Sequence, residues 1–118
     1  MPDVAYTDRE AQGNVRVIKW ADMANGESGE PLLIPWRADK TVQVFGTFGE
    51  NGSVTIQGSN DLMTADSKTY ATLHKVDLSA LTYTAAGIDV ILENCNLIRP
   101  TVTAGDETTE LTIIICLK

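Results

Sequence analysis

Hydrophobic and polar positions alternate over residues 42–61, VQVFGTFGENGSVTIQGSND, and predict two strands joined by a glycine-bearing turn. Val42 and Val44 fall on one side of the first strand, and Val54 and Ile56 share one side of the second. We expect both pairs to lie on the same buried face, which limits how the two strands can be joined.

Two hairpin registers are compatible with this stretch. A two-residue turn at Asn51-Gly52 would place the two apolar pairs on opposite faces, because a shift of one residue reverses every side chain. A three-residue loop over 50–52 pairs Phe48 with Val54 and keeps the buried face continuous. We therefore expect the longer loop, closed by Gly52 in the left-handed conformation. Phe45 then points to the other face and requires cover from a second layer or another subunit.

A second hairpin is predicted near the C-terminus. A four-residue loop over 105–108 would pair Ala104 with Thr109 and join two apolar faces, one at even and one at odd positions. Because Ile114 and Cys116 also make the opposite face of the last strand apolar, we expect that strand to be central in a sheet or buried at a contact.

The remaining strand signals are shorter. Residues 14–23 alternate as a strand, and 31–36 form a short edge segment bounded by prolines. Further strands are expected at 70–76 and 81–84, and 61–69 is expected to be a loop. Residues 88–93 are compatible with a strand or a helical turn, and their β-branched content favours a strand. Residues 1–13 are polar and predict a flexible N-terminal arm, with Val4 and Tyr6 as its anchors.

About eight short strands without a convincing amphipathic helix predict an all-β fold. We expect a single β-sandwich, jelly-roll-like, over residues 14–118, preceded by the flexible arm at 1–13. The length of 118 residues suits one domain with one core.

Charge and composition narrow the partners. The net charge is −7, from 9 basic and 16 acidic residues, and the basic residues are scattered along the chain. Direct nucleic-acid binding and attachment to anionic lipid are not expected, since both require a basic face. No run approaches a membrane span, and the N-terminus lacks the features of a signal peptide, so we expect folding in a cytoplasm.

Candidate chemistry is sparse. The single histidine, His74, lies within a predicted strand, and no serine occupies a Gly-x-Ser-x-Gly context. Cys95 and Cys116 each lie beside or within an apolar strand and are expected to be buried free thiols, with a single disulfide between them as the alternative. A metal site would need more ligands at close spacing. We therefore expect no enzymatic activity, no catalytic or cofactor-binding residues, no metal and no cofactor.

Contact residues are the better candidates for function. Aromatic side chains are favoured at interfaces and in sugar-binding platforms, although core packing is the commoner role of each tryptophan. The candidate interface residues are Val4, Tyr6, Trp20, Trp36 and Phe45. Self-association is also expected, because Phe45, Ile114 and Cys116 point away from the predicted core.

An ordered series of segments resembles small virion proteins of tailed bacteriophages, of the capsid decoration or cementing type. The segments are 42–61, 71–73, 83–88, 92–94, 98–103 and 105–112, so the resemblance spans most of residues 40–118. No single motif is diagnostic, and the region before residue 40 has no match.

The resemblance implies a non-enzymatic β-sandwich that binds the major capsid protein on the outer surface of a phage capsid. Such proteins stabilise the shell and often cluster as trimers, so a trimer is the favoured homo-oligomer. The implied location is the exterior of the virion, after synthesis in the cytoplasm of the bacterial host. The alternatives are a carbohydrate-binding β-sandwich, with Trp20, Trp36 or Tyr70 as a stacking platform, and a tail-associated virion protein.

Overall fold

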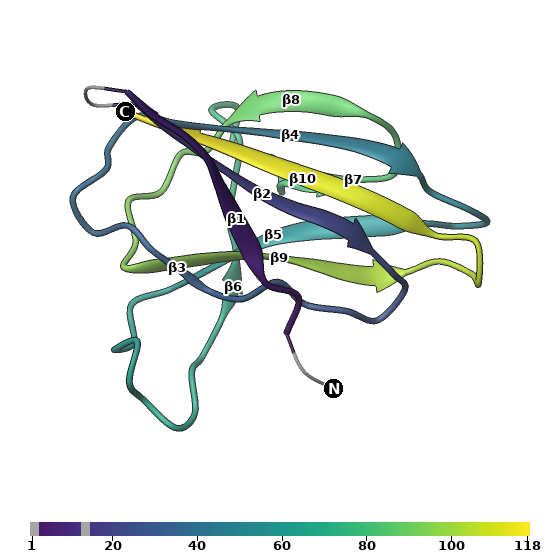
Figure 1. Ribbon diagram of the computed structural model, residues 1–118, viewed down its shortest axis with the longest axis horizontal. Coiled ribbons are helices and arrows are strands. Elements are labelled where there is room, and N and C mark those ends of the chain that lie inside the picture. The colour runs from purple at the N-terminus through teal and green to yellow at the C-terminus, as the bar shows by residue number, and fades with distance from the viewer. Residues whose placement is uncertain (1–2, 13–14) are drawn as a thin grey trace.

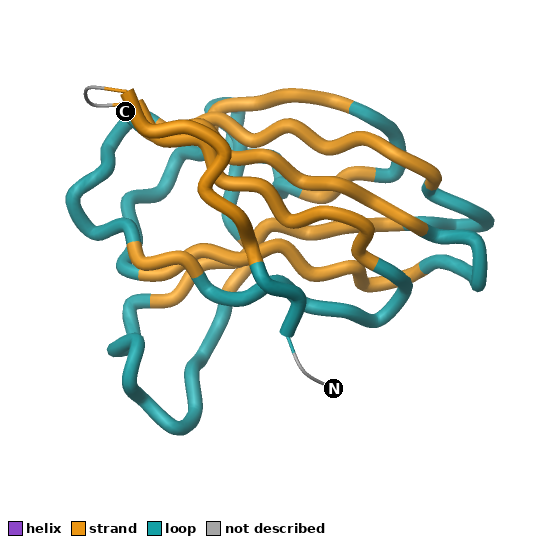
Figure 2. The backbone as a smooth tube through the Cα atoms, viewed as in Figure 1, coloured by secondary structure: helices purple, strands orange, loops and turns teal. Residues whose placement is uncertain are grey.

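Two antiparallel sheets lie face to face in the computed structural model, which describes residues 3–12 and 15–118 (Figure 1). One sheet has the strand order β1-β2-β10-β4-β8, and the other has β3-β9-β5-β6, with β7 also paired to β5. No helix occurs among the described residues (Figure 2). The expected all-β sandwich is confirmed. The strands are β1 (Tyr6–Gln12), β2 (Val15–Met23), β3 (Leu32–Leu33), β4 (Lys40–Thr47), β5 (Ser53–Ser59), β6 (Ala71–Thr72), β7 (Thr82–Tyr83), β8 (Gly87–Val90), β9 (Leu97–Ala104) and β10 (Glu110–Leu117).

The strand pairs are nested along the chain. β2 pairs with β10, β3 with β9, β4 with β8, and β5 with β6, each antiparallel. The chain thus runs out as one long strand series, reverses in the loop over residues 60–70, and returns alongside itself. Because successive members of the ladder alternate between the sheets, it is rolled into the sandwich arrangement of a jelly roll.

The hairpin expected over 42–61 is wrong in its pairing. β4 and β5 belong to different sheets, so the turn between them is an arch from one layer to the other. Gly52 does not take the left-handed conformation; Gly49 and Asn51 do, with φ of 72° and 58°. The burial pattern was predicted correctly, because Val44 and Val54 are both fully buried. They face the core from opposite layers instead of lying side by side.

The second expected hairpin is wrong for the same reason. β9 and β10 also lie in different sheets, and Ala104 pairs with Ser53 of β5 instead of with Thr109. The expectation for the last strand is confirmed, since β10 lies between β2 and β4 in the middle of its sheet. A central strand is covered on one face by the core and can present apolar residues on the other.

The shorter strands lie where the sequence predicts them, but most are shorter than predicted. β3 is an edge strand within 31–36, and the segment over 61–69 is a loop, as expected. The strand expected over 70–76 is reduced to β6 and an isolated bridge between His74 and Ala80. β8 occupies the first part of the strand expected over 88–93.

The expectation of a flexible arm over 1–13 is corrected for residues 6–12, which form β1 along the free edge of β2. Val4 N donates a hydrogen bond to Ser28 O at 2.9 Å, and the Tyr6 ring meets Trp20 edge to face at 5.8 Å. These backbone and ring contacts hold the segment to the sandwich. Residues 1, 2, 13 and 14 lie outside the described residues.

The two arches are tied together at one end of the sandwich by Asp106. Its carboxylate accepts hydrogen bonds from Glu50 N at 2.8 Å and from Thr108 N at 2.8 Å. The Thr108 hydroxyl donates a further bond at 2.6 Å. Hydrogen bonds to the charged form lower the pKa of Asp106 from 3.8 to about 2.

We predict that Asp106→Ala destabilises the protein at pH 7 and that the difference from the wild type narrows as the pH falls from 3.8 through about 2. The sign follows from a folded-state pKa below the ordinary value, so the contribution is complete above 3.8 and disappears on protonation. Urea unfolding of both proteins at pH 7 and at low pH measures the difference. Glu107→Ala, at an exposed neighbour in the same turn, is the control; an equal effect of both variants would contradict the prediction.

Candidate functional site

The outer side of the sheet that contains β10 carries an area without charged side chains, which extends over parts of β10, β4 and β8. Register sets Ile114 beside Gln43 and Gln43 beside Ile88, and the next row contains Cys116, Thr41 and Val90. This surface, called the outer face below, consists of Thr41, Gln43, Phe45, Ile88, Val90, Ile114 and Cys116, with Thr112 buried among them. Two charged residues border it on the same side of the sheet: Glu110, opposite Thr47, and Lys19, opposite Ile114. On a chain with a net charge of −7, an uncharged face of this extent is suited to contact with another protein surface.

A hollow of about 180 Å³ lies at one end of the outer face and is lined in part by Thr41, Val90 and Cys116. Lys40 lies beneath it, buried, with Nζ donating to Ala38 O at 3.3 Å and to Asn94 Oδ1 at 2.6 Å. Burial lowers the pKa of Lys40. Because these acceptors are neutral, the ammonium group acts as a tie between the loop before β4 and the segment after β8.

Exposed apolar side chains are concentrated in one part of the chain, which includes two residues of the outer face, Ile88 and Val90. Eight large hydrophobic residues are exposed among the described residues, and five of them lie between 76 and 92. The sequence interpretation missed these five as contact residues, although 88, 90 and 92 alternate in the pattern that a half-buried strand would show. They are Val76, Leu78, Ile88, Val90 and Leu92.

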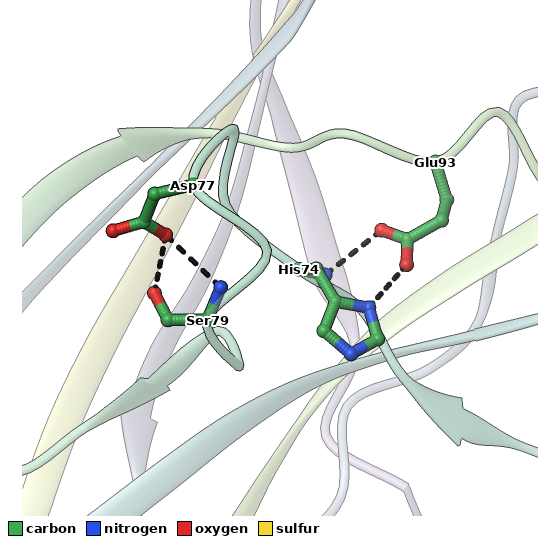
Figure 3. Close-up of polar contacts among 4 residues, drawn as sticks. All are labelled: His74, Asp77, Ser79 and Glu93. Carbon is green, nitrogen blue, oxygen red and sulfur yellow. Dashed lines mark hydrogen bonds and ion pairs between the residues drawn. The ribbon is translucent and has the colours of Figure 1, made fainter.

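Two carboxylates, those of Glu93 and Asp77, organise the hairpin over 74–80 (Figure 3). Val76 and Leu78 belong to the same hairpin. Glu93 accepts a hydrogen bond from His74 N at 2.8 Å and contacts His74 Nδ1 through its other oxygen. Asp77 accepts bonds from the N–H and hydroxyl of Ser79 at 3.0 and 2.6 Å. The bonds from His74 lower the pKa of Glu93 against the opposing effect of burial. The contacts between His74 and Glu93 hold the hairpin against the segment that follows β8.

A groove of about 530 Å³ lies next to this pair and is lined by His74, Glu93 and Cys95 among others. A histidine oriented by a carboxylate is a common acid–base unit. The Cys95 thiol donates to Leu97 O at 3.1 Å, and burial raises its pKa, so it stays protonated. No group of three or more acidic, histidine or cysteine residues among the described residues could hold a metal ion.

The structure places the five sequence-predicted interface residues in different environments. Trp20 is fully buried in the core, where its Nε1 donates to Glu30 O at 3.1 Å, so its side chain is closed to a partner. Val4 and Tyr6 pack partly against the core. Trp36 is 63% exposed, and Phe45, on the outer face, is 38% exposed. An interface role for these residues stays a prediction, and the structure does not gather them into one patch.

Comparisons with known proteins were made for sequence and for fold. No known family and no curated protein matches the sequence. The fold is similar to that of the SPBc2 prophage-derived protein YomS, with a TM-score of 0.59 at 9% identity, covering 92% of this chain and 98% of that one. An oxalate oxidase in complex with the substrate analogue glycolate has a TM-score of 0.47 at 17% identity, covering 88% of this chain and 41% of that one. A cupin-2 domain protein from Shewanella frigidimarina NCIMB 400 has a TM-score of 0.44 at 13% identity, covering 98% and 81%.

At 9% identity, the likeness to YomS shows the fold of the chain alone, and it extends over nearly the whole of both chains. The described residues contain no helix long and apolar enough to cross a membrane.

We predict that Glu93→Gln loosens the hairpin over 74–80 without unfolding the sandwich. Replacement of the carboxylate weakens its bonds to His74, because bonds to charged groups are the stronger ones. Amide hydrogen exchange at His74 should become about three- to tenfold faster. Glu110→Gln, at an exposed position of β10, should leave that rate unchanged. Unaltered exchange at His74 in the Glu93 variant would contradict the assigned role.

Proposed function

We propose that this protein is a non-enzymatic structural protein of a tailed-bacteriophage virion, which binds the exterior of the assembled capsid and stabilises it. The outer face is the observation that carries the proposal, because a broad uncharged surface on an acidic domain serves contact and not catalysis. The prophage origin of YomS and the ordered sequence resemblance to capsid decoration proteins support the phage assignment.

The partner in this proposal is the major capsid protein, and contact with nucleic acid or membrane plays no part. The protein assembles as a homo-oligomer, with a trimer as the favoured state, so several weak contacts reinforce one another on the shell. Such binding would not require a large interface per copy. Capsid binding requires an exposed face whose side chains can lose their water without a large cost in free energy. The apolar and uncharged polar groups of the outer face meet this requirement better than charged groups would.

We predict that Phe45→Glu weakens capsid binding, because it places a charge on the uncharged outer face. Purified protein is mixed with expanded, undecorated heads of the phage that encodes it, and the bound fraction is measured by co-sedimentation. We expect about a tenfold loss of affinity or more, since a buried unpaired charge is costly at an interface. Thr103→Glu makes the same charge change at an exposed position on the other sheet and is the matched control.

Binding of the wild type to heads with loss in the Phe45 variant alone supports the proposal. Binding to tails and not to heads would sink the capsid assignment and favour the tail-associated alternative. Equal loss in both variants would show that net charge, and not the outer face, governs binding.

Carbohydrate binding is the second candidate function, and the exposure of Trp36 is the observation that favours it. The other stacking candidates are less available. Trp20 is buried, and the Tyr70 ring is covered by the Arg99 guanidinium at 3.7 Å from the ring centroid. Loss of glycan-array binding in Trp36→Ala would support this candidate, and an array without hits for the wild type would exclude it.

A further inference from the structure

We propose that the free edge of β8 joins two copies of this chain, by antiparallel pairing of one β8 with the β8 of a second copy. The contact is distinct from capsid binding and would form in solution. It extends the sheet β1-β2-β10-β4-β8 into the corresponding sheet of the second copy (Figure 1).

The first observation is that β8 lacks the devices that protect the other sheet edges. β1 carries a bulge between Asp8 and Glu10, and an ion pair from Asp8 to Arg16 at 2.7 Å. β3 has two residues and lies between Pro31 and Pro35, and β6 also has only two residues. Bulges, prolines, charges and short strands all discourage edge pairing.

β8 departs from this pattern. It pairs with β4 in a regular register over four residues, and its sequence, GIDV, contains no proline or lysine. Ile88 and Val90 are 63% and 46% exposed. An exposed, regular and apolar edge strand is a template for another strand.

The second observation is the direction of the backbone groups. Ile91 N donates to Lys40 O at 3.0 Å, toward β4, whereas Leu92 N donates to His74 O on the opposite side. Because successive residues of a strand point to opposite sides, the N–H and C=O groups of Ile88 and Val90 face away from β4. Within the described part of the chain, no strand pairs with that side of β8 at these two residues.

These groups define a self-complementary register. Pairing Ile88 with Val90 of the second copy uses all of the free groups and follows twofold symmetry, in which each residue contact occurs twice. It also sets the apolar side chains of Ile88 and Val90 opposite each other on the outer face, as favourable cross-strand pairs. Exposed Leu92 follows the strand closely, and its N–H donates to His74 O in the hairpin that carries exposed Val76 and Leu78.

The self-complementary register favours a second copy as the occupant, and the low charge of the β8 edge permits the contact. Two molecules with a net charge of −7 repel each other, so they can meet only where the local charge is low. The single charge on β8 is Asp89, and it is compensated within its own chain. Its carboxylate accepts from the Tyr83 hydroxyl at 2.7 Å and lies 3.7 Å from Lys75 Nζ. The proposed register sets the two Asp89 residues opposite each other, which leaves a residual repulsion and provides a test.

Sedimentation velocity of the full chain, with reductant and without capsids, from about 1 µM to about 1 mM tests the proposal. We expect a wild-type oligomer with an even number of copies that dissociates on dilution: a dimer, or a hexamer if the contact joins two trimers of the proposed function. Ile88→Lys should raise the dissociation constant at least about tenfold. Asp89→Asn should lower it about threefold, because it removes the facing charges. Leu62→Lys, at another exposed hydrophobic in the loop over 61–69, is the matched control and should change nothing.

Strengthening by Asp89→Asn separates specific pairing from a simple loss of folding in Ile88→Lys. A wild-type monomer up to about 1 mM would overturn the proposal, as would a trimer that Ile88→Lys leaves intact. Equal effects of Ile88→Lys and Leu62→Lys would also overturn it. Because capsids are absent, failure of capsid binding and failure of β8 pairing are distinguishable.

Discussion

The pairing of β10, the last strand, with β2 near the start of the chain is the constraint on which the rest of the structure depends. β10 lies between β2 and β4, and its inward residues Ile113 and Ile115 are fully buried. β4 is held by β10, and β8 is held by β4, so both the outer face and the free edge exist only after the two ends of the chain have met. Contacts between such distant segments form late and slowly in folding.

The sequence allowed the fold class and the buried positions to be predicted, but not the strand pairing. Val42, Val44, Val54 and Ile56 were assigned to the core, and all four are fully buried. A hairpin and an arch both direct alternate side chains inward, so hydrophobic alternation cannot distinguish them. The information that decides between them lies in the other strands, since β4 meets β10 and β5 meets β9.

The candidate site shows a similar limit. Phe45, Ile114 and Cys116 were correctly expected to point away from the core. Side chains alternate between the two faces along a strand, so their direction follows from positions within one strand. The addition of Ile88 and Val90 to the same face depends on β4–β8 pairing across more than forty residues, which no local pattern encodes. Aromatic character was a poor guide, since Trp20 fills the core while Trp36 is exposed. Burial follows from position in the ladder and not from residue type alone.

The two faces of the sandwich differ in a way that bears on assembly. The sheet with β9 and β5 carries a polar network on its outer side, in which Thr101 and Arg99 both donate to Gln57 Oε1, at 3.1 and 3.0 Å. Those groups satisfy one another and are stable when exposed to water. The outer face has no comparable network and consists mainly of groups that gain by desolvation. The proposed contacts would therefore use the sheet with the outer face and its β8 edge, and would leave the hydrogen-bonded sheet in solvent.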